Sequence, residues 1–144
     1  MSEGGCRCGA ARYALAIDGA PSSYACHCRD CQTMSGSAFA LQVPAPASAL
    51  EVSGDLVSWK HPSRSGAEAE QFFCAICHTR LYSTNSSRPG IVILRAGTLD
   101  ESDALVPKLH IWMKRKQPWV DLPEGVPAFM ESAPPAEFVA ILMG

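Results

Sequence analysis

The chain has 144 residues, of which 47% are hydrophobic and 18% charged, and its formal net charge is −2. This length predicts a domain with a buried core, and the small negative charge argues against a nucleic-acid partner. No apolar run reaches the roughly 18 residues of a membrane span, and residues 1–5 lack the basic and apolar regions of a signal peptide. We therefore expect no membrane partner and a cytoplasmic location.

Short runs with alternating apolar residues, separated by Gly, Pro and Ser, predict an all-β domain. In chain order, we expect strands at 12–17, 38–43, 56–60, 70–73, 80–83, 91–95 and 109–113. The segments 44–49 and 85–90 are expected to be surface connections, because proline removes ladder donors and glycine permits tight turns. Residues 134–143 are expected to form a short helix. No repeat or internal boundary is visible, so residues 1–144 are expected to form a single domain.

Seven cysteines are the most informative feature of the chain. They form a first cluster, Cys6-x-Cys8, a middle cluster, Cys26-x-Cys28-x-x-Cys31, and a third cluster, Cys74-x-x-Cys77. In a reducing compartment this spacing predicts metal ligands rather than disulfides. A Cys-x-x-Cys pair brings two sulfurs together in a tight turn. A Cys-x-Cys pair does so on an extended segment, where residues i and i+2 project to the same side.

Zinc is the metal that such thiolate clusters favour, and a structural zinc site has four ligands. The first and third clusters together supply four, which predicts a structural site made of Cys6, Cys8, Cys74 and Cys77. The middle cluster then has three ligands, Cys26, Cys28 and Cys31, and holds a second zinc with one open position. A thiol bound at that position would lose its proton and become a nucleophile. We therefore expect two zinc ions per chain.

The spacing alone leaves other arrangements open. Cys74 and Cys77 could instead close a site with Cys28 and Cys31, which would leave the other three cysteines as buried thiols. A protein group could also complete the middle site and leave no open position; the candidates are His27, Asp30, His61, His78 and His110. His27 lies between two ligand positions, so we expect it to point away from the metal, either behind the ligands or at the surface. A redox role for the middle cluster is a third alternative.

Several flanking segments carry a family resemblance. The sequences 5–10, 26–31, 35–37, 73–77, 96–100 and 110–112, with Pro118-Trp119, together resemble the glutathione-dependent formaldehyde-activating enzyme family, whose domain centromere protein V shares. The ordered set of three cysteine clusters is highly specific. The resemblance covers a core of about 5–129 and leaves a C-terminal tail, 130–144.

This resemblance implies a β-tent fold, in which antiparallel sheets are stapled by a structural zinc. It also implies a catalytic-type zinc on the middle cluster and a carbon-sulfur lyase activity toward glutathione–aldehyde adducts such as S-(hydroxymethyl)glutathione. The expected partners are a small thiol such as glutathione and an aldehyde. The alternative function is a non-enzymatic, zinc-stapled module that binds protein or nucleic acid. No motif in the sequence indicates which side chain would act as a general base.

Some residues outside the clusters also carry expectations. The family usually has glycine after the second cysteine of the third cluster, whereas this chain has His78, which must then tolerate a positive φ unless the turn differs. Trp112 and Trp119 are expected in the core. His110 fits either a core position or a pocket wall. The basic run 114–116 would suit the carboxylates of glutathione, although short basic runs are usually exposed surface.

Overall fold

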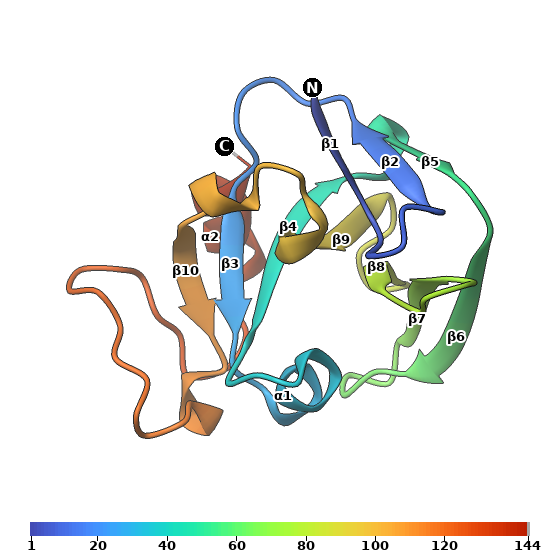
Figure 1. The fold of residues 1–144 in the computed structure, drawn as a ribbon. Helices are drawn as coiled ribbons and strands as arrows, with labels where there is room; N and C mark the ends of the chain where they lie inside the picture. The colour runs from blue at the N-terminus through green and yellow to red at the C-terminus, as the bar shows by residue number, and fades with distance from the viewer. Residues whose placement is uncertain (144) are drawn as a thin grey trace. The chain divides into compact units, whose positions relative to one another are not determined.

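The computed structural model describes residues 1–143. By its internal contacts the chain divides into two compact units, the first made of Met1–Pro21 and Pro44–Ala104 and the second of Ser22–Val43 and Leu105 onward. Within residues 1–143, ten strands and two short α-helices make the protein mostly β, which confirms the predicted fold class (Figure 1). Among residues 1–143, no helix has both the length and the apolar character needed to cross a membrane.

The first unit contains two groups of antiparallel strands. One is a sheet in the order β1-β2-β5, formed by β1 (Ser2–Gly5), β2 (Arg12–Leu15) and β5 (Leu50–Ser53). The other has the order β9-β8-β7-β6, formed by β6 (Leu56–Pro62), β7 (Glu68–Cys74), β8 (Arg80–Asn85) and β9 (Ile91–Arg95). Short 3-10 turns lie at η1 (Ala47–Ala49), η2 (Ala96–Thr98) and η3 (Ser102–Ala104).

In the second unit, β3 (Ser23–Cys26) lies between β10 (Pro107–Ile111) and β4 (Ala40–Pro46). The pairing of β3 with β4 is antiparallel, but its pairing with β10 is parallel. The short helix α1 (Arg29–Ser35) follows β3, and the 3-10 turn η4 (Met113–Arg115) follows β10. The tail forms α2 (Pro135–Leu142), as the sequence predicts, and the ring of Phe138 packs edge-on against Tyr24 at 5.1 Å.

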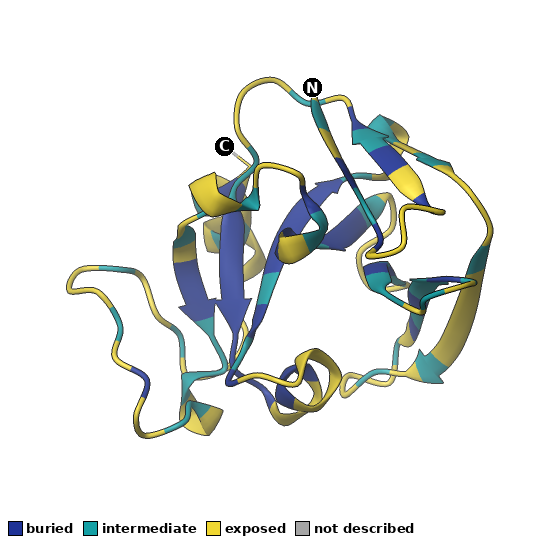
Figure 2. Cartoon of the chain, viewed as in Figure 1, coloured by how far each residue is buried: buried dark blue, intermediate teal, exposed yellow. Residues whose placement is uncertain are grey.

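Each unit has its own buried residues (Figure 2). In the first unit, Leu15, Leu81 and Leu94 are fully buried. In the second unit all four residues of β3 are buried, together with Leu109 of β10. Because β3 is covered on both faces, its sequence Ser-Tyr-Ala-Cys shows no apolar alternation, and the strand was not predicted.

Several local features differ from the expectations. The prolines at 44 and 46 lie in β4 rather than in a connection; β4 pairs with β3 only through Ala40–Gln42, so these prolines cost no donor in that pairing. Residues 6–8 form a turn, with a hydrogen bond from Gly9 N–H to the Cys6 carbonyl at 3.3 Å, instead of an extended segment. The helix α1 was not expected. The strand predicted at 109–113 lies at Pro107–Ile111, and η4 begins at Met113.

Candidate metal centre

Four cysteine sulfurs of the first unit gather in one place. They belong to Cys6, Cys8, Cys74 and Cys77, and all lie within 4.8 Å of one another. The sulfurs of Cys6 and Cys8 are 3.6 Å apart, and those of Cys8 and Cys74 are 3.8 Å apart. A tetrahedral zinc with Zn–S bonds of about 2.3 Å needs sulfurs separated by about 3.8 Å. This four-sulfur group therefore has the size and the chemistry to hold a metal ion.

The local backbone positions the cysteines of the four-sulfur group and donates hydrogen bonds to their sulfurs. The turn between β7 and β8 is closed by a hydrogen bond from His78 N–H to the Cys74 carbonyl at 3.0 Å, and His78 has a φ of 59°. This is the positive φ that a residue at that position was expected to tolerate. The N–H groups of Ala11 and Ile76 donate to the sulfurs of Cys6 and Cys74 at 3.3 and 3.4 Å. Such donors stabilise negative charge on the sulfurs.

Thr79 links the turn that carries Cys77 to the turn that carries Cys6 and Cys8. Its hydroxyl lies 3.1 Å from the sulfur of Cys77, and it accepts a hydrogen bond from the N–H of Arg7 at 3.2 Å. The bond from the Thr79 hydroxyl is the main cause that lowers the pKa of Cys77 to about 5. These contacts favour the thiolate form of Cys77, which is the form that binds metals.

Three further sulfurs gather in the second unit. They belong to Cys26, Cys28 and Cys31, which are all buried and lie within 4.8 Å of one another. Within residues 1–143, no fourth His, Cys, Asp or Glu belongs to this three-sulfur group. Cys26 ends β3, Cys28 caps α1 with extended backbone angles, and Cys31 lies in the first turn of α1. The change from strand to helix therefore brings the three side chains to one point.

Two neutral donors point at the three-sulfur group. The N–H of Cys31 donates to the sulfur of Cys28 at 3.3 Å, and Gln42 Nε2 donates to the sulfur of Cys31 at 3.5 Å. Gln42 lies on β4 and is 7% exposed. Since a metal-bound thiolate can only accept hydrogen bonds, the Nε2 atom of this amide is the one that faces it. Sequence reasoning missed Gln42, because an isolated glutamine in a strand shows no ligand spacing.

Electrostatics in the three-sulfur group favour a cation. The adjacent sulfurs of Cys28 and Cys31, followed by burial, raise the pKa of Cys26 above its ordinary value. Three buried thiolates repel one another, and a divalent cation among them would remove that repulsion while keeping each sulfur deprotonated. The donor set therefore fits a soft or borderline metal such as zinc.

His27 lies between two of these cysteines, but its ring does not join them. Its Nε2 is 2.9 Å from Nδ1 of His110, and both rings are buried. Burial, followed by the neighbouring charges of His110 and Lys116, lowers the pKa of His27 to about 4. Burial also lowers the pKa of His110. Both histidines are therefore neutral near pH 7 and pack as a core pair, which excludes a surface position for His27.

The sequence also singled out His61, Trp119 and the basic run 114–116. His61 Nδ1 donates to the Pro62 carbonyl at 3.1 Å. Trp119 is 72% exposed, so its predicted core position was wrong. In the basic run, Lys114 pairs with Glu131, and Lys116 donates to the carbonyls of residues 117 and 120 at 3.1 and 2.7 Å.

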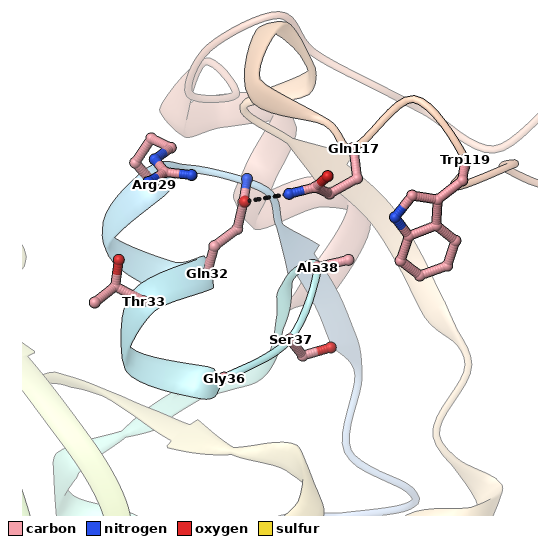
Figure 3. Close-up of a pocket in the computed structure, with 8 residues that line it drawn as sticks. All are labelled: Arg29, Gln32, Thr33, Gly36, Ser37, Ala38, Gln117 and Trp119. Atoms are coloured by element: carbon pink, nitrogen blue, oxygen red, sulfur yellow. Dashed lines mark hydrogen bonds between the residues drawn. The ribbon is translucent and has the colours of Figure 1, made fainter.

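A shallow depression of about 400 Å³ lies over α1 in the second unit (Figure 3). Its wall includes Arg29, Gln32 and Gly36, which share one face of the helix by their spacing. Cys31 is not among the lining residues, because helical periodicity turns it to another face. The floor is tied together by a bond from Gln117 Nε2 to Gln32 Oε1 at 2.9 Å, while Gln32 Nε2 donates to the His27 carbonyl at 2.7 Å. These amides hold the start of α1 in place behind the three-sulfur group.

The fold and the two sulfur groups define a mostly β protein with two separate cysteine clusters that could each hold a metal ion. The family model of the glutathione-dependent formaldehyde-activating enzyme matches residues 1–115. The chain belongs to this family. The confirmed resemblance suggests glutathione-dependent formaldehyde activation.

Individual relatives agree with the family match. A protein of Halomonas elongata, provisionally named a glutathione-dependent formaldehyde-activating enzyme, is 27% identical over 131 residues, covering 85% of this chain and 81% of that protein. A crystal structure of a Rhodobacter sphaeroides protein is similar in fold, with a TM-score of 0.55 and 22% identity; the match covers 69% of this chain and 88% of the other.

Proposed function

We propose that the protein is a zinc-dependent carbon-sulfur lyase that acts on glutathione–aldehyde adducts such as S-(hydroxymethyl)glutathione. In this proposal, Cys6, Cys8, Cys74 and Cys77 hold a structural zinc. Cys26, Cys28 and Cys31 hold a catalytic-type zinc. The partners are a small thiol such as glutathione and an aldehyde, and the reducing cytoplasm is the compartment that keeps all seven thiols available.

One observation carries the proposal: the three-sulfur group contains three buried sulfurs and no fourth protein donor among residues 1–143. Structural zinc sites have four protein ligands, whereas catalytic sites have three and leave one position for water or substrate. Zinc in such a site would supply an open position that favours the thiolate form of an incoming thiol. Membership of the family supports glutathione as that thiol.

The residues of the chain have defined tasks in this proposal. Cys26, Cys28 and Cys31 hold the metal from a rigid strand-to-helix corner. The Cys31 N–H and the Gln42 amide stabilise two of the thiolates by neutral hydrogen bonds. Neutral, buried His27 and His110 support the strand end without adding charge. In the reaction the carbon–sulfur bond of the adduct breaks, the carbonyl bond of the aldehyde forms, and the hydroxyl proton passes to the thiol.

The test replaces native zinc with cobalt and titrates glutathione. Because sulfur ligands change the visible spectrum of cobalt, thiol binding at an open position is expected to alter the absorption of one of the two bound ions. Zinc-loaded protein is expected to accelerate turnover of S-(hydroxymethyl)glutathione, and a Cys26→Ser variant is expected to lose both effects. An unchanged spectrum together with unchanged adduct turnover would refute the proposal. Two ions that are both fully protein-ligated would instead favour the non-enzymatic module.

A further inference from the structure

The strand β6 is the free edge of the strands β6 to β9 in the first unit. Every residue of β6 pairs with β7, from Leu56 opposite Cys74 to Pro62 opposite Glu68. Among residues 1–143, no strand pairs with the other edge of β6. The strand is exposed along most of its length (Figure 2). An open edge of this kind can accept a further strand, because its backbone groups have no ladder partner.

The hydrogen-bond register shows which backbone groups of β6 face the open edge. Ala75 N–H donates to the Asp55 carbonyl at 2.9 Å, and this pair continues the register of β6 with β7. In an antiparallel ladder, bonded and non-bonded pairs alternate. The odd-numbered residues of β6 therefore bond to β7. The N–H and C=O groups of Ser58 and Lys60 face the open edge.

One side of β6 carries exposed apolar surface beside this edge. Val57, Trp59 and His61 project to the same side, because alternate residues of a strand do so. Val57 is 46% exposed and Trp59 is 54% exposed, and the indole stacks on the ring of His61 with centroids 4.1 Å apart. Edge strands that stay unpaired are normally protected by charges, prolines or short length. Large exposed apolar side chains at an edge instead favour a partner strand.

Lys60 is the charged residue of β6, and its expected partner is engaged elsewhere. It lies opposite Glu70 of β7, where opposite charges attract each other. The carboxylate of Glu70 instead accepts a hydrogen bond from the Ser58 hydroxyl at 2.7 Å. Within residues 1–143, Lys60 forms no ion pair. Its ammonium group is therefore available to a carboxylate from outside the chain.

A second copy of β6, paired in antiparallel orientation, matches the open edge. When Trp59 lies opposite Trp59 of the second copy, Ser58 lies opposite Lys60 of that copy, so the backbone groups that face the edge bond to each other. The ammonium of Lys60 in one copy then lies beside the Ser58–Glu70 hydrogen bond of the other. Two-fold symmetry repeats this contact. A register that places Lys60 opposite itself would instead bring like charges together.

We propose that the open edge of β6 pairs with the same edge of a second copy of this chain, which makes the protein a homodimer. In this dimer Trp59 meets Trp59 at the two-fold axis, and Lys60 of each copy pairs with Glu70 of the other. The interface uses neither a metal nor a thiol, so it goes beyond the proposed lyase chemistry.

Sedimentation equilibrium of the metal-loaded protein tests the dimer. A monomer–dimer equilibrium in the micromolar range is expected, since a single strand edge forms a small interface. Trp59→Lys places two ammonium groups opposite each other and is expected to weaken the dimer by at least about tenfold. Trp119→Lys is the matched control, because Trp119 is also strongly exposed but lies in the second unit. It is expected to leave the dissociation constant within about twofold of the wild type.

A mixing experiment separates contacts between copies from effects within one chain. Lys60→Glu and Glu70→Lys are each expected to weaken their own dimer by about tenfold, because symmetry places like charges together at two contacts. In an equimolar mixture of the two variants, a heterodimer has opposite charges at both contacts. The mixture is therefore expected to associate about as tightly as the wild type. Changes confined to one chain cannot be rescued by mixing.

Several results would overturn the proposal. These are a protein that stays monomeric up to about 0.5 mM, a Trp59→Lys variant that dimerises as tightly as the wild type, a Trp119→Lys variant with the same effect, or a mixture no tighter than its two components. If Trp59→Lys fails to fold by circular dichroism, Ser58→Pro removes only an N–H that faces the open edge and is expected to weaken the dimer likewise. None of these experiments measures thiol binding or adduct turnover, so their failure leaves the lyase proposal untouched.

Discussion

The hydrogen bond from Gln42 to Cys31 predicts a measurable effect on metal affinity. Gln42→Met keeps the apolar volume of the side chain but removes the donor that lies 3.5 Å from the sulfur. A hydrogen bond to a charged acceptor contributes about 1.5–3 kcal/mol, which corresponds to roughly 10- to 100-fold in an equilibrium constant. Loss of groups that support metal ligands typically has an effect of about this size on metal affinity. We therefore expect the three-sulfur group to bind zinc at least about tenfold more weakly.

Chelator competition measures this effect, with the Cys26→Ser variant identifying which ion is released. The four-sulfur group is the internal control and is expected to keep its affinity. The Gln42→Glu variant is expected to bind zinc at the three-sulfur group more weakly than Gln42→Met does, because it places a carboxylate beside the thiolate. Thr33→Val, a change at an exposed residue of the same unit, is expected to leave both affinities unchanged. The reasoning is refuted if Gln42→Met holds zinc within about twofold of the wild type.

Three further predictions follow from other parts of the structure. His78→Gly is expected to raise the free energy of unfolding by up to about 1 kcal/mol, because relief of a φ of 59° exceeds the added entropy of unfolded glycine; a lower denaturant midpoint would contradict this. Cys74→Ala is expected to lower the zinc content from two ions to one, measured by elemental analysis; an unchanged content would exclude Cys74 as a ligand. The free energy of unfolding is expected to fall as pH decreases from about 6.5 toward about 4, because buried His27 and His110 resist the protons that the unfolded chain binds. Urea unfolding at several pH values should show that the free energy of unfolding changes less with pH in His110→Gln than in the wild type. An equal change would argue against the buried histidines as the cause.

Part of the fold was visible in the sequence because β7 and β8 alternate between buried and more exposed residues. The expected strand at 91–95 also has the same bounds as β9. The same rule failed for β3, which is buried on both sides and has no alternation to detect. It also failed for α1, whose seven residues are too few to show a helical period. The parallel pairing of β10 with β3 depends on contacts between distant segments, which no local pattern encodes.

The candidate site shows the same division between local and distant information. Short spacings such as Cys74-x-x-Cys77 bring sulfurs together through a single turn, so the sequence alone indicated metal binding. Which clusters share a site depends on long-range chain placement, and the structure brings together the sulfurs of Cys6 and Cys8 with those of Cys74 and Cys77.

By itself, the sequence determined that this protein is mostly β, carries three clusters of potential metal ligands and belongs with the formaldehyde-activating enzymes. These properties depend on residue type and on spacing over a few positions. Only the tertiary structure decided that Gln42 faces Cys31 and that His27 pairs with His110. Such contacts join residues far apart in the chain, and their geometry is set by strand register and burial rather than by local sequence.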